Sequence, residues 1–246
     1  RLMGAKHVDF LVPNRFKHGY GLSPEIVKEA KRDKEPDLII TVDNGISSNE
    51  GAELARSLDI DVIITDHHLP PNELPNANAI INPNLRGCDF PSKNLAGVGV
   101  CFYLFSSLKT YLTKQGYFEK NNIQNPDLRT LLDLVALGTV ADVVKLDQNN
   151  RILVNEGIKR IREKRCSKGI LAILELTKRP VDSLQASDLG FTVAPRINAA
   201  GRLSDISQGI RCLLSDDMND ARRYAQTLEE FNIKRRKEQT RMQDEA

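Results

Sequence analysis

The stretch that decides the fold runs from Leu38 to His68 and reads LIITVDNGISSNEGAELARSLDIDVIITDHH. Two short apolar runs rich in β-branched residues, Leu38–Val42 and Val62–Thr65, lie near its two ends. Each run is followed by an aspartate, Asp43 after the first and Asp66 after the second. The residues between the runs have helical spacing, and a strand, a helix and a strand in about 30 residues form a βαβ unit. The stretch therefore predicts two parallel strands in an α/β fold.

The predicted helix of this unit has a start signal of its own. Ser47, followed three residues later by Glu50, fits a capping box. Ala52, Ala55 and Leu58 then recur at the spacing of one helical face. We expect this helix to cross over the sheet and connect the two strands.

Flanking segments extend the alternation of strands and helices. Val8–Val12 is a short apolar run that predicts a strand, and Ser23-Pro24 supplies an N-cap with proline at the first helical position. Ala79–Ile81 predicts a further short strand, which ends in a turn at Asn82-Pro83. The pattern favours a doubly wound, mainly parallel sheet.

The second half of the chain predicts a mostly helical part. The Ala186–Asp205 stretch contains APRINAAGRLSD, whose proline, glycine and arginines indicate a shaped loop or a broken helix. From Asp216 a long helix is expected to run to the end of the chain. Other helices are expected at Leu95–Leu112, at Leu128–Val144 with a break near Gly138-Thr139, at Ile152–Ile161 and at Ile170–Leu176.

Composition sets limits on the class of protein. The chain has 246 residues, of which 40% are hydrophobic and 28% charged, with a net charge of +2. Nucleic-acid binding would therefore depend on local placement of Lys and Arg, not on bulk charge. Its four cysteines form no Cys-x-x-Cys pair, which argues against a zinc ribbon or a disulfide framework and fits a reducing cytoplasm. No apolar run approaches the ~18 residues of a membrane span, so we expect no membrane association.

Polar side chains gather at one predicted edge of the sheet. Asp43 and Asp66 follow neighbouring parallel strands, where open α/β sheets keep their ligand sites. Two of the chain's four histidines, His67 and His68, come directly after Asp66. Helix capping or turn formation would explain Asp43 alone, but three adjacent polar groups at a buried edge favour a metal. Carboxylates with imidazoles suit Mn²⁺, Mg²⁺, Fe or Zn²⁺.

Further candidates lie outside this stretch. Asp142 is surrounded by the apolar segment LVALGTVADVV, and it reads equally as a metal ligand or as the exposed end of a helix. Three arginines, Arg15, Arg196 and Arg202, lie in stretches that contain glycine or proline. The guanidinium group suits phosphate because it donates two parallel hydrogen bonds. A solvated surface position is the alternative for each of them.

In combination, these motifs resemble the DHH phosphoesterase superfamily. The residues that carry the resemblance are VDNG at 42–45, DHH at 66–68, AGVG at 96–99, GTVADVV at 138–144 and PRINAAGR at 195–202. The flanking segments PNRFKHGYGLSPE (13–25) and INPNLRGCDFPSKNLAGVGV (81–100) make the chain similar to the members that degrade single-stranded DNA from its 5′ end. The similarity runs from about residue 7 to beyond residue 230.

The resemblance implies a two-metal phosphodiesterase that uses Mn²⁺ or Mg²⁺. Asp43 would be a carboxylate shared near both metals, and His67 and Asp142 would be further ligands. His68 would lie toward the scissile phosphate, and Asp66 would orient the histidines.

The same resemblance implies contacts with single-stranded DNA. Stacking of a base on Tyr20 or Phe16 would be tolerant of sequence, as an exonuclease requires. The residues expected along the DNA path or at its 5′ phosphate are Arg15, Tyr20, Arg196, Asn198 and Arg202. Single-strand binding protein and a helicase are the protein partners that the resemblance implies, and we expect a monomer in the cytoplasm.

The chain departs from the superfamily pattern at both ends. The superfamily carries an Asp-x-Asp-x-x-Gly motif on an earlier strand and a second, C-terminal domain, and this sequence contains neither. We therefore expect a fragment: residues 1–215 as a DHH-type catalytic core without its first strand, and residues 216–246 as the start of a connecting helix. Such a fragment is expected to be inactive or weakly active alone.

Two alternatives stay open. Related proteins cleave short RNA, cyclic dinucleotides or pyrophosphate, and a degenerate DHH core serves as a scaffold subunit of a replication complex. The scaffold would not require the intact residues Asp43, His67, His68 and Asp142.

Overall fold

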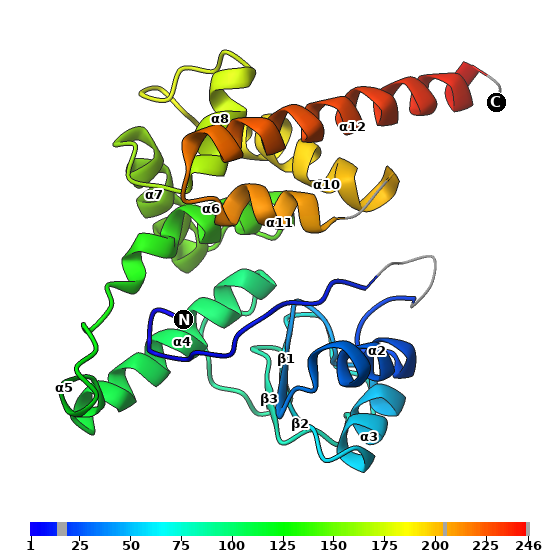
Figure 1. Cartoon of the computed structure of the whole chain (residues 1–246), viewed down its shortest axis with the longest axis vertical. Helices are drawn as coiled ribbons and strands as arrows, with labels where there is room; N and C mark the ends of the chain where they lie inside the picture. Colours follow the sequence, from blue (N-terminus) through cyan, green and yellow to red (C-terminus); the bar gives the residue numbers. More distant parts are fainter. Residues whose placement is uncertain (14–18, 204–205, 245–246) are drawn as a thin grey trace. The chain divides into compact units, whose positions relative to one another are not determined.

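The computed structural model of the chain describes residues 1–13, 19–203 and 206–244. The chain forms two compact units, both visible in Figure 1. The first contains residues 1–128 and 144–150, and the second contains residues 129–143 and 151–246. The predicted βαβ stretch lies wholly in the first unit.

The first unit is built on a three-stranded parallel sheet in the order β1-β2-β3. Its strands are β1 (Leu38–Val42), β2 (Asp61–Thr65) and β3 (Ala79–Ile81). Leu38 is paired with Asp61 and Ile63 with Ala79, so all three strands end at the same edge of the sheet. The predicted α/β fold with a parallel sheet is confirmed.

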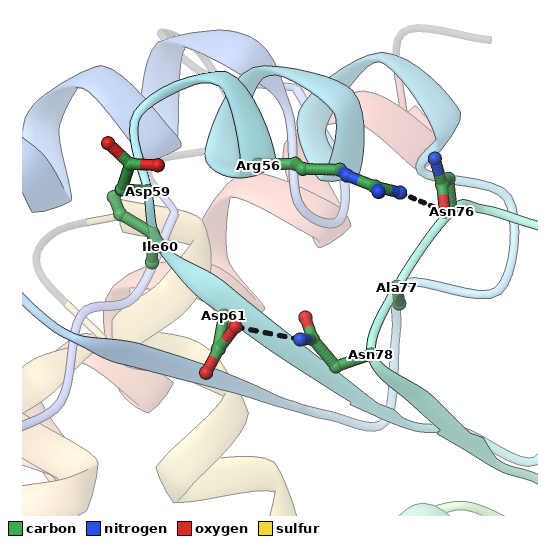
Figure 2. Close-up of a pocket in the computed structure, with 7 residues that line it drawn as sticks. All are labelled: Arg56, Asp59, Ile60, Asp61, Asn76, Ala77 and Asn78. Atoms are coloured by element: carbon green, nitrogen blue, oxygen red, sulfur yellow. Dashed lines mark hydrogen bonds between the residues drawn. The ribbon is translucent and has the colours of Figure 1, made fainter.

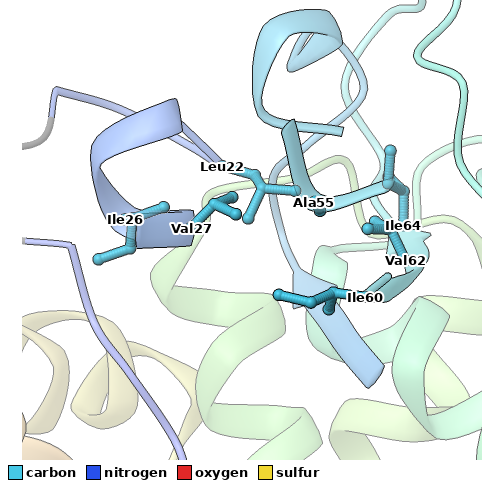
Figure 3. Close-up of a cluster of buried hydrophobic side chains, with 7 residues drawn as sticks. All are labelled: Leu22, Ile26, Val27, Ala55, Ile60, Val62 and Ile64. Atoms are coloured by element: carbon cyan, nitrogen blue, oxygen red, sulfur yellow. The ribbon is translucent and has the colours of Figure 1, made fainter. Parts of the chain in front are cut away.

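Helices cover both faces of this sheet. On one face, α2 (Pro24–Lys34) and α3 (Asn49–Ser57) enclose an apolar cluster with the strands (Figure 3). This cluster consists of Leu22, Ile26, Val27, Ala55, Ile60, Val62 and Ile64. On the other face, to which Thr65 points because side chains alternate along a strand, Cys101 of α4 (Gly97–Lys114) lies against Thr65. A short helix, α5 (Tyr117–Lys120), follows α4.

The start signals of the two helices that cover the first face had different outcomes. Ser23 caps α2 as expected, because its hydroxyl oxygen accepts the N–H of Ile26. The predicted capping box of α3 is wrong: the N-cap residue is Ser48, which makes no side-chain cap bond. The hydroxyl of Ser48 accepts the N–H of Leu22 instead, so it ties α3 to the segment before α2.

The strand predicted at Val8–Val12 is also wrong. Residues 8–12 belong to no strand, and no described strand pairs with them. An apolar run becomes a strand when a neighbouring backbone accepts and donates its hydrogen bonds, and β2 and β3 take no part in such bonding with this run. Asp9 is instead paired with Lys34 at the end of α2, at a distance of 2.5 Å.

The second unit is helical in all its described elements. The longest helix, α12, packs against α8, α10 and α11. The elements are η1 (Leu128–Leu131), α6 (Leu132–Ala141), α7 (Gln148–Arg162), α8 (Lys168–Leu176), α9 (Ala186–Asp188), the π-helical turn η2 (Leu189–Val193), α10 (Ala194–Leu203), α11 (Ser207–Leu214) and α12 (Met218–Asp244).

Two details of the helical half differ from or sharpen the expectation. The break expected near Gly138-Thr139 is not there, because the carbonyl of Gly138 still accepts the N–H of Asp142. The helix ends after Ala141, and Val143 takes a left-handed backbone conformation with φ 59°. The described part of the Ala186–Asp205 stretch is helical throughout: η2 is a π-helical turn between α9 and α10, and APRINAAGRL forms α10. The expected shaped loop or broken helix is not there in these described residues. Within the described residues, no helix is both long and apolar enough to cross a membrane.

Replacing Gly51 with alanine should destabilise the first unit. A Cβ atom at this position would lie 1.8 Å from the carbonyl oxygen of Leu22, so α3 would have to move away from the segment that leads into α2. Overpacking of this kind costs about 1–3 kcal/mol, and urea unfolding should show the loss as a lower midpoint. Glu53→Ala, at an exposed position of the same helix, is the control. Equal midpoints for the two variants would contradict this packing.

Candidate metal centre

The chain turns sharply at the end of β1. Asp43 extends the β-ladder by one bond, because its N–H donates to the carbonyl of Thr65 at 3.0 Å. Its own backbone then takes the left-handed conformation, with φ 66°, and Gly45 follows with φ 109°. Aspartate tolerates this conformation better than most residues. The turn is closed by Thr41, whose hydroxyl donates to the carbonyl of Asn44 at 2.7 Å.

This turn brings the carboxylate of Asp43 to the end of β2. Asp43 Oδ1 lies 2.9 Å from His67 Nε2. Potential ligand atoms of Asp43, His67 and His68 all lie within 4.8 Å of one another. The two histidine rings are tilted by 57° with their centroids 4.5 Å apart. The structure therefore brings together three of the side chains that the sequence singled out.

Asp66 is hydrogen-bonded to both histidines of this group. Its side chain is buried, and Oδ1 accepts the N–H groups of His67 and His68 as well as Nδ1 of the His68 ring, at 2.7–3.1 Å. Oδ2 accepts the N–H of Ile46 at 2.9 Å. Burial by itself would raise the pKa of Asp66, but the hydrogen bonds from His68, Ile46 and His67 outweigh it and hold the pKa below its usual value. Asp66 is thus a buried carboxylate that is hydrogen-bonded to both histidines.

The first residue of α4 lies directly against Asp43. A Cβ atom at Gly97 would be 2.4 Å from Asp43 Oδ1 and 2.7 Å from its Cα atom. Glycine is therefore required at this position for the helix to begin so close to the carboxylate. Thr65 and Cys101 continue the contact one turn further along α4, with 3.1 Å between their oxygen and sulfur atoms.

The chemistry of this group fits a divalent cation. Asp43 Oδ1 is shielded from solvent and, among the described residues, accepts no hydrogen bond, although an imidazole nitrogen faces it. The two atoms are both shielded from solvent and lie 2.9 Å apart, and a cation bound by both would satisfy them. Carboxylate oxygen and imidazole nitrogen are ligands that Mn²⁺ accepts, and the carboxylate also suits Mg²⁺.

Asp142 belongs to the second unit. It follows the last residue of α6 and is exposed. Its part as a further metal ligand stays a prediction.

Of the candidate DNA-binding residues, the structure places one beside the metal group. Tyr20 is exposed and its hydroxyl donates to the carbonyl of Asp43 at 3.3 Å, so it lies beside the metal group. Asn198 is exposed on α10. Arg15 and Phe16 lie outside the described residues, as does the side chain of Arg202.

Arg196 is anchored inside the second unit. It is only 8% exposed, donates to the carbonyl of Thr192 at 2.7 Å, and forms an ion pair with Glu229 of α12 at 2.5 Å. These contacts assign it a definite structural task, which is to hold α10 to α12.

Sequence reasoning missed two residues that contact the group. Asn82 and Asn84 follow β3, and their amide groups donate to the main-chain carbonyls of His68 and His67. The sequence pattern at Asn82 indicated a turn and nothing more. The available signal was their position: β3 ends at the same sheet edge as β2, so polar side chains after it are placed to reach the histidines.

A pocket lies at the opposite end of β2 and β3 from the Asp43 group (Figure 2). It has a volume of about 450 Å³ and is lined by Arg56, Asp59, Ile60, Asp61, Asn76, Ala77 and Asn78. Its polar side chains are exposed, and four of them form two hydrogen-bonded pairs: Arg56 donates to Asn76 at 2.8 Å, and Asn78 donates to Asp61 at 2.7 Å. Nothing in its geometry resembles the group around Asp43.

Comparison with known proteins identifies the protein family of the chain. The family model described as the DHH family, N-terminal domain, matches residues 1–139. The chain belongs to the DHH family, as the resemblance of its motifs predicted.

Individual relatives narrow the comparison. The single-stranded-DNA-specific exonuclease RecJ of Escherichia coli (strain K12) is 57% identical over 246 residues, which are 100% of this chain and 42% of that protein. RecJ of Bacillus subtilis (strain 168) is 38% identical over 97% of this chain and 28% of its own length. The chain thus spans less than half the length of these relatives.

Solved structures agree with the fold. The crystal structure of exonuclease RecJ bound to manganese matches with a TM-score of 0.77 and 33% identity, over 94% of this chain and 55% of that one. RecJ from Thermus thermophilus in complex with Mn²⁺ matches with a TM-score of 0.73 and 32% identity, over 89% of this chain and 31% of that one.

Replacing Gly97 with alanine should weaken metal binding. The new methyl group would overlap Asp43 Oδ1 and push the carboxylate away from His67. Displacing the supports of a metal ligand typically costs about 10–100-fold in affinity, and a titration with Mn²⁺ followed by electron paramagnetic resonance would measure it. Gly99→Ala is the matched control, because its Cβ atom would meet only the flexible Leu95 side chain. Unchanged affinity in Gly97→Ala would contradict this description of the centre.

Proposed function

We propose that this chain carries the metal-binding core of an exonuclease that hydrolyses phosphodiester bonds of single-stranded DNA from the 5′ end, in DNA repair and recombination. The observation that carries the proposal is the convergence of Asp43, His67 and His68 at one edge of a parallel sheet. The names and metal-bound structures of the RecJ relatives support it. The whole protein's activity is part of the proposal, because the chain spans 42% of the Escherichia coli relative.

In this proposal Asp43 and His67 hold Mn²⁺ or Mg²⁺, and Asp142 completes the ligand set. Such a cation supplies, when bound, Lewis-acid activation of the phosphodiester and of the attacking water in a two-metal mechanism. The Asp43 carboxylate sits where α4 and the end of β2 meet and is held there by the close approach of Gly97. Asp66 fixes the ligand geometry by binding the N–H groups of both histidines.

His68 has a different part from His67. Its Nδ1 atom is 2.7 Å from Asp66 Oδ1, and its side chain is 48% exposed. Because Asp66 occupies Nδ1, the ring presents Nε2 to its surroundings. His68 is thereby arranged to contact the scissile phosphate, while His67, at 12% exposed, is turned toward Asp43.

The DNA path is proposed from the candidates that the family resemblance implies. Tyr20 offers a ring that is 65% exposed beside Asp43, where a base could stack without regard to sequence. Arg15, Arg202 and Asn198 would supply hydrogen bonds to phosphate. Arg196 would contribute by holding α10 in place, since its guanidinium is already bonded to Glu229 and Thr192.

Binding to single-strand binding protein and to a helicase is proposed from the family resemblance. A cytoplasmic location is proposed because the four cysteines form no Cys-x-x-Cys pair, and a monomer is the default expectation. Cleavage of short RNA or cyclic dinucleotides, and a non-catalytic scaffold, are the alternatives against which the proposal is tested.

Asp43→Ala and His67→Ala in the intact protein should each lower the rate of DNA hydrolysis by at least about 100-fold, the cost of removing a single stabilising group from many active sites. The assay is release of nucleotides from a 5′-phosphorylated, internally labelled single strand with Mn²⁺. Asp59→Asn, an exposed carboxylate at the other end of the sheet, is the control and should keep full activity.

Three results would contradict the proposal. Full activity in Asp43→Ala or His67→Ala would remove the metal centre from the reaction. Faster hydrolysis of a dinucleotide than of the long single strand by the unsubstituted protein would favour a small phosphodiester substrate, and no hydrolysis of either would favour a scaffold.

A further inference from the structure

The turn that carries the two histidines is held on both sides of its main chain. The N–H groups of His67 and His68 are bound by Asp66, as described above. Their carbonyl groups are bound by two asparagines that follow β3. Asn84 Nδ2 donates to the His67 carbonyl at 2.6 Å, and Asn82 Nδ2 donates to the His68 carbonyl at 2.9 Å.

The two asparagines are themselves fixed. The N–H of Asn84 donates to Asn82 Oδ1 at 2.8 Å, so the side chain of Asn82 holds the main chain of Asn84. Asn82 is only 3% exposed. The N–H of Asp66 donates to the carbonyl of Ile81 at 3.1 Å, which continues the ladder between β2 and β3 up to the residue before Asn82.

A lysine side chain also holds the segment that carries the two asparagines. Lys93 Nζ donates to the carbonyls of Pro83 and Cys88, at 2.7 and 2.6 Å. The residue between the two asparagines is therefore anchored as well. These bonds hold the main chain that carries Asn82 and Asn84.

The consequence concerns the direction of the His67 ring. Side-chain direction follows the backbone, because the Cα–Cβ bond is fixed by the neighbouring peptide planes. Both peptide groups of His67 are held, one through its N–H and the other through its carbonyl. The backbone of His67 is therefore held in the conformation that places Nε2 of its ring 2.9 Å from Asp43 Oδ1.

We infer that Asn82 and Asn84 are positioning residues of the metal centre, which fix both histidines in their binding geometry through the main-chain carbonyls. The inference rests on the proposed function for its metal, but the bonds that carry it belong to the protein alone. A ligand arranged in advance binds more tightly, because ordering it costs nothing at the moment of binding.

The same strand offers a matched control. Asn78 precedes β3 and contacts the start of β2: it accepts the N–H of Val62 at 2.8 Å and donates to Asp61 at 2.7 Å. It is the same residue type beside the same strand, and its side chain also bonds to the main chain of a neighbouring segment, here at the start of β2. It touches neither histidine, so its loss should affect stability without affecting the metal centre.

The test uses the intact protein with Asn84→Ala, Asn84→Asp and Asn78→Ala. Asn84→Asp keeps the side-chain volume and removes the donor. Hydrogen–deuterium exchange of the metal-free protein, followed on a peptide that covers residues 61–70, reports on the turn itself. Titration with Mn²⁺ reports on binding. Both Asn84 variants should exchange faster in this peptide and bind Mn²⁺ about 10-fold more weakly, whereas Asn78→Ala should bind Mn²⁺ as the unsubstituted protein does.

The outcomes separate this inference from the proposed function. Unchanged exchange in both Asn84 variants overturns the inference, whatever happens to the metal. Faster exchange with unchanged Mn²⁺ affinity overturns the positioning role, as would an equal loss of affinity in Asn78→Ala. If the unsubstituted protein binds no Mn²⁺, the proposed metal centre fails, and the exchange data still decide whether the asparagines hold the turn.

Discussion

The geometry of the candidate site depends on the hydrogen bonds that the buried carboxylate of Asp66 accepts. One oxygen accepts the main-chain N–H of His67 and the ring nitrogen of His68, and the other accepts the N–H of Ile46 in the loop after β1. The ends of two neighbouring strands are thereby tied to one side chain. Asp43 lies in the loop that Ile46 anchors, and His67 lies in the turn that Asp66 binds directly. A neutral or shorter side chain at position 66 would release both together.

A second constraint comes from the opposite face of the sheet. Helix α4 begins at a glycine because any larger residue would overlap Asp43. The carboxylate is therefore confined between the helix start and the His67 ring. Asp43 also carries an uncommon backbone conformation, which in folded proteins persists only where surrounding contacts enforce it. The contacts with Thr65, Tyr20 and α4 provide that enforcement.

The sequence predicted those features whose cause is local or periodic. Apolar β-branched runs predicted β1 and β2, and the rule that parallel strands end at one edge predicted that Asp43 would meet His67. The failures arise where a distant group decides. The N-cap of α3 is Ser48 and not Ser47, and the Ser48 hydroxyl accepts the N–H of the distant residue Leu22. Val8–Val12 has the composition of a strand but no described strand pairs with it.

Long-range partners also decide the character of individual side chains. Nothing near Arg196 in the sequence indicates Glu229, 33 residues away, although that pairing holds the guanidinium inside the second unit. Asn82 and Asn84 had the composition of a turn, and only the parallel pairing of β2 with β3 places them against the histidine carbonyls. Sequence patterns identify the ligands of such a centre more readily than the residues that position them.

Asp43 and His67 are proposed to bind a divalent cation in a geometry that the protein itself sets. The most direct test is a crystal structure of the intact protein grown with Mn²⁺, with data collected at the manganese absorption edge. We expect an anomalous peak at about 2.0–2.3 Å from Asp43 Oδ1 and His67 Nε2, typical of such ligands. Manganese bound elsewhere while these two atoms remain without a cation would contradict the proposed centre.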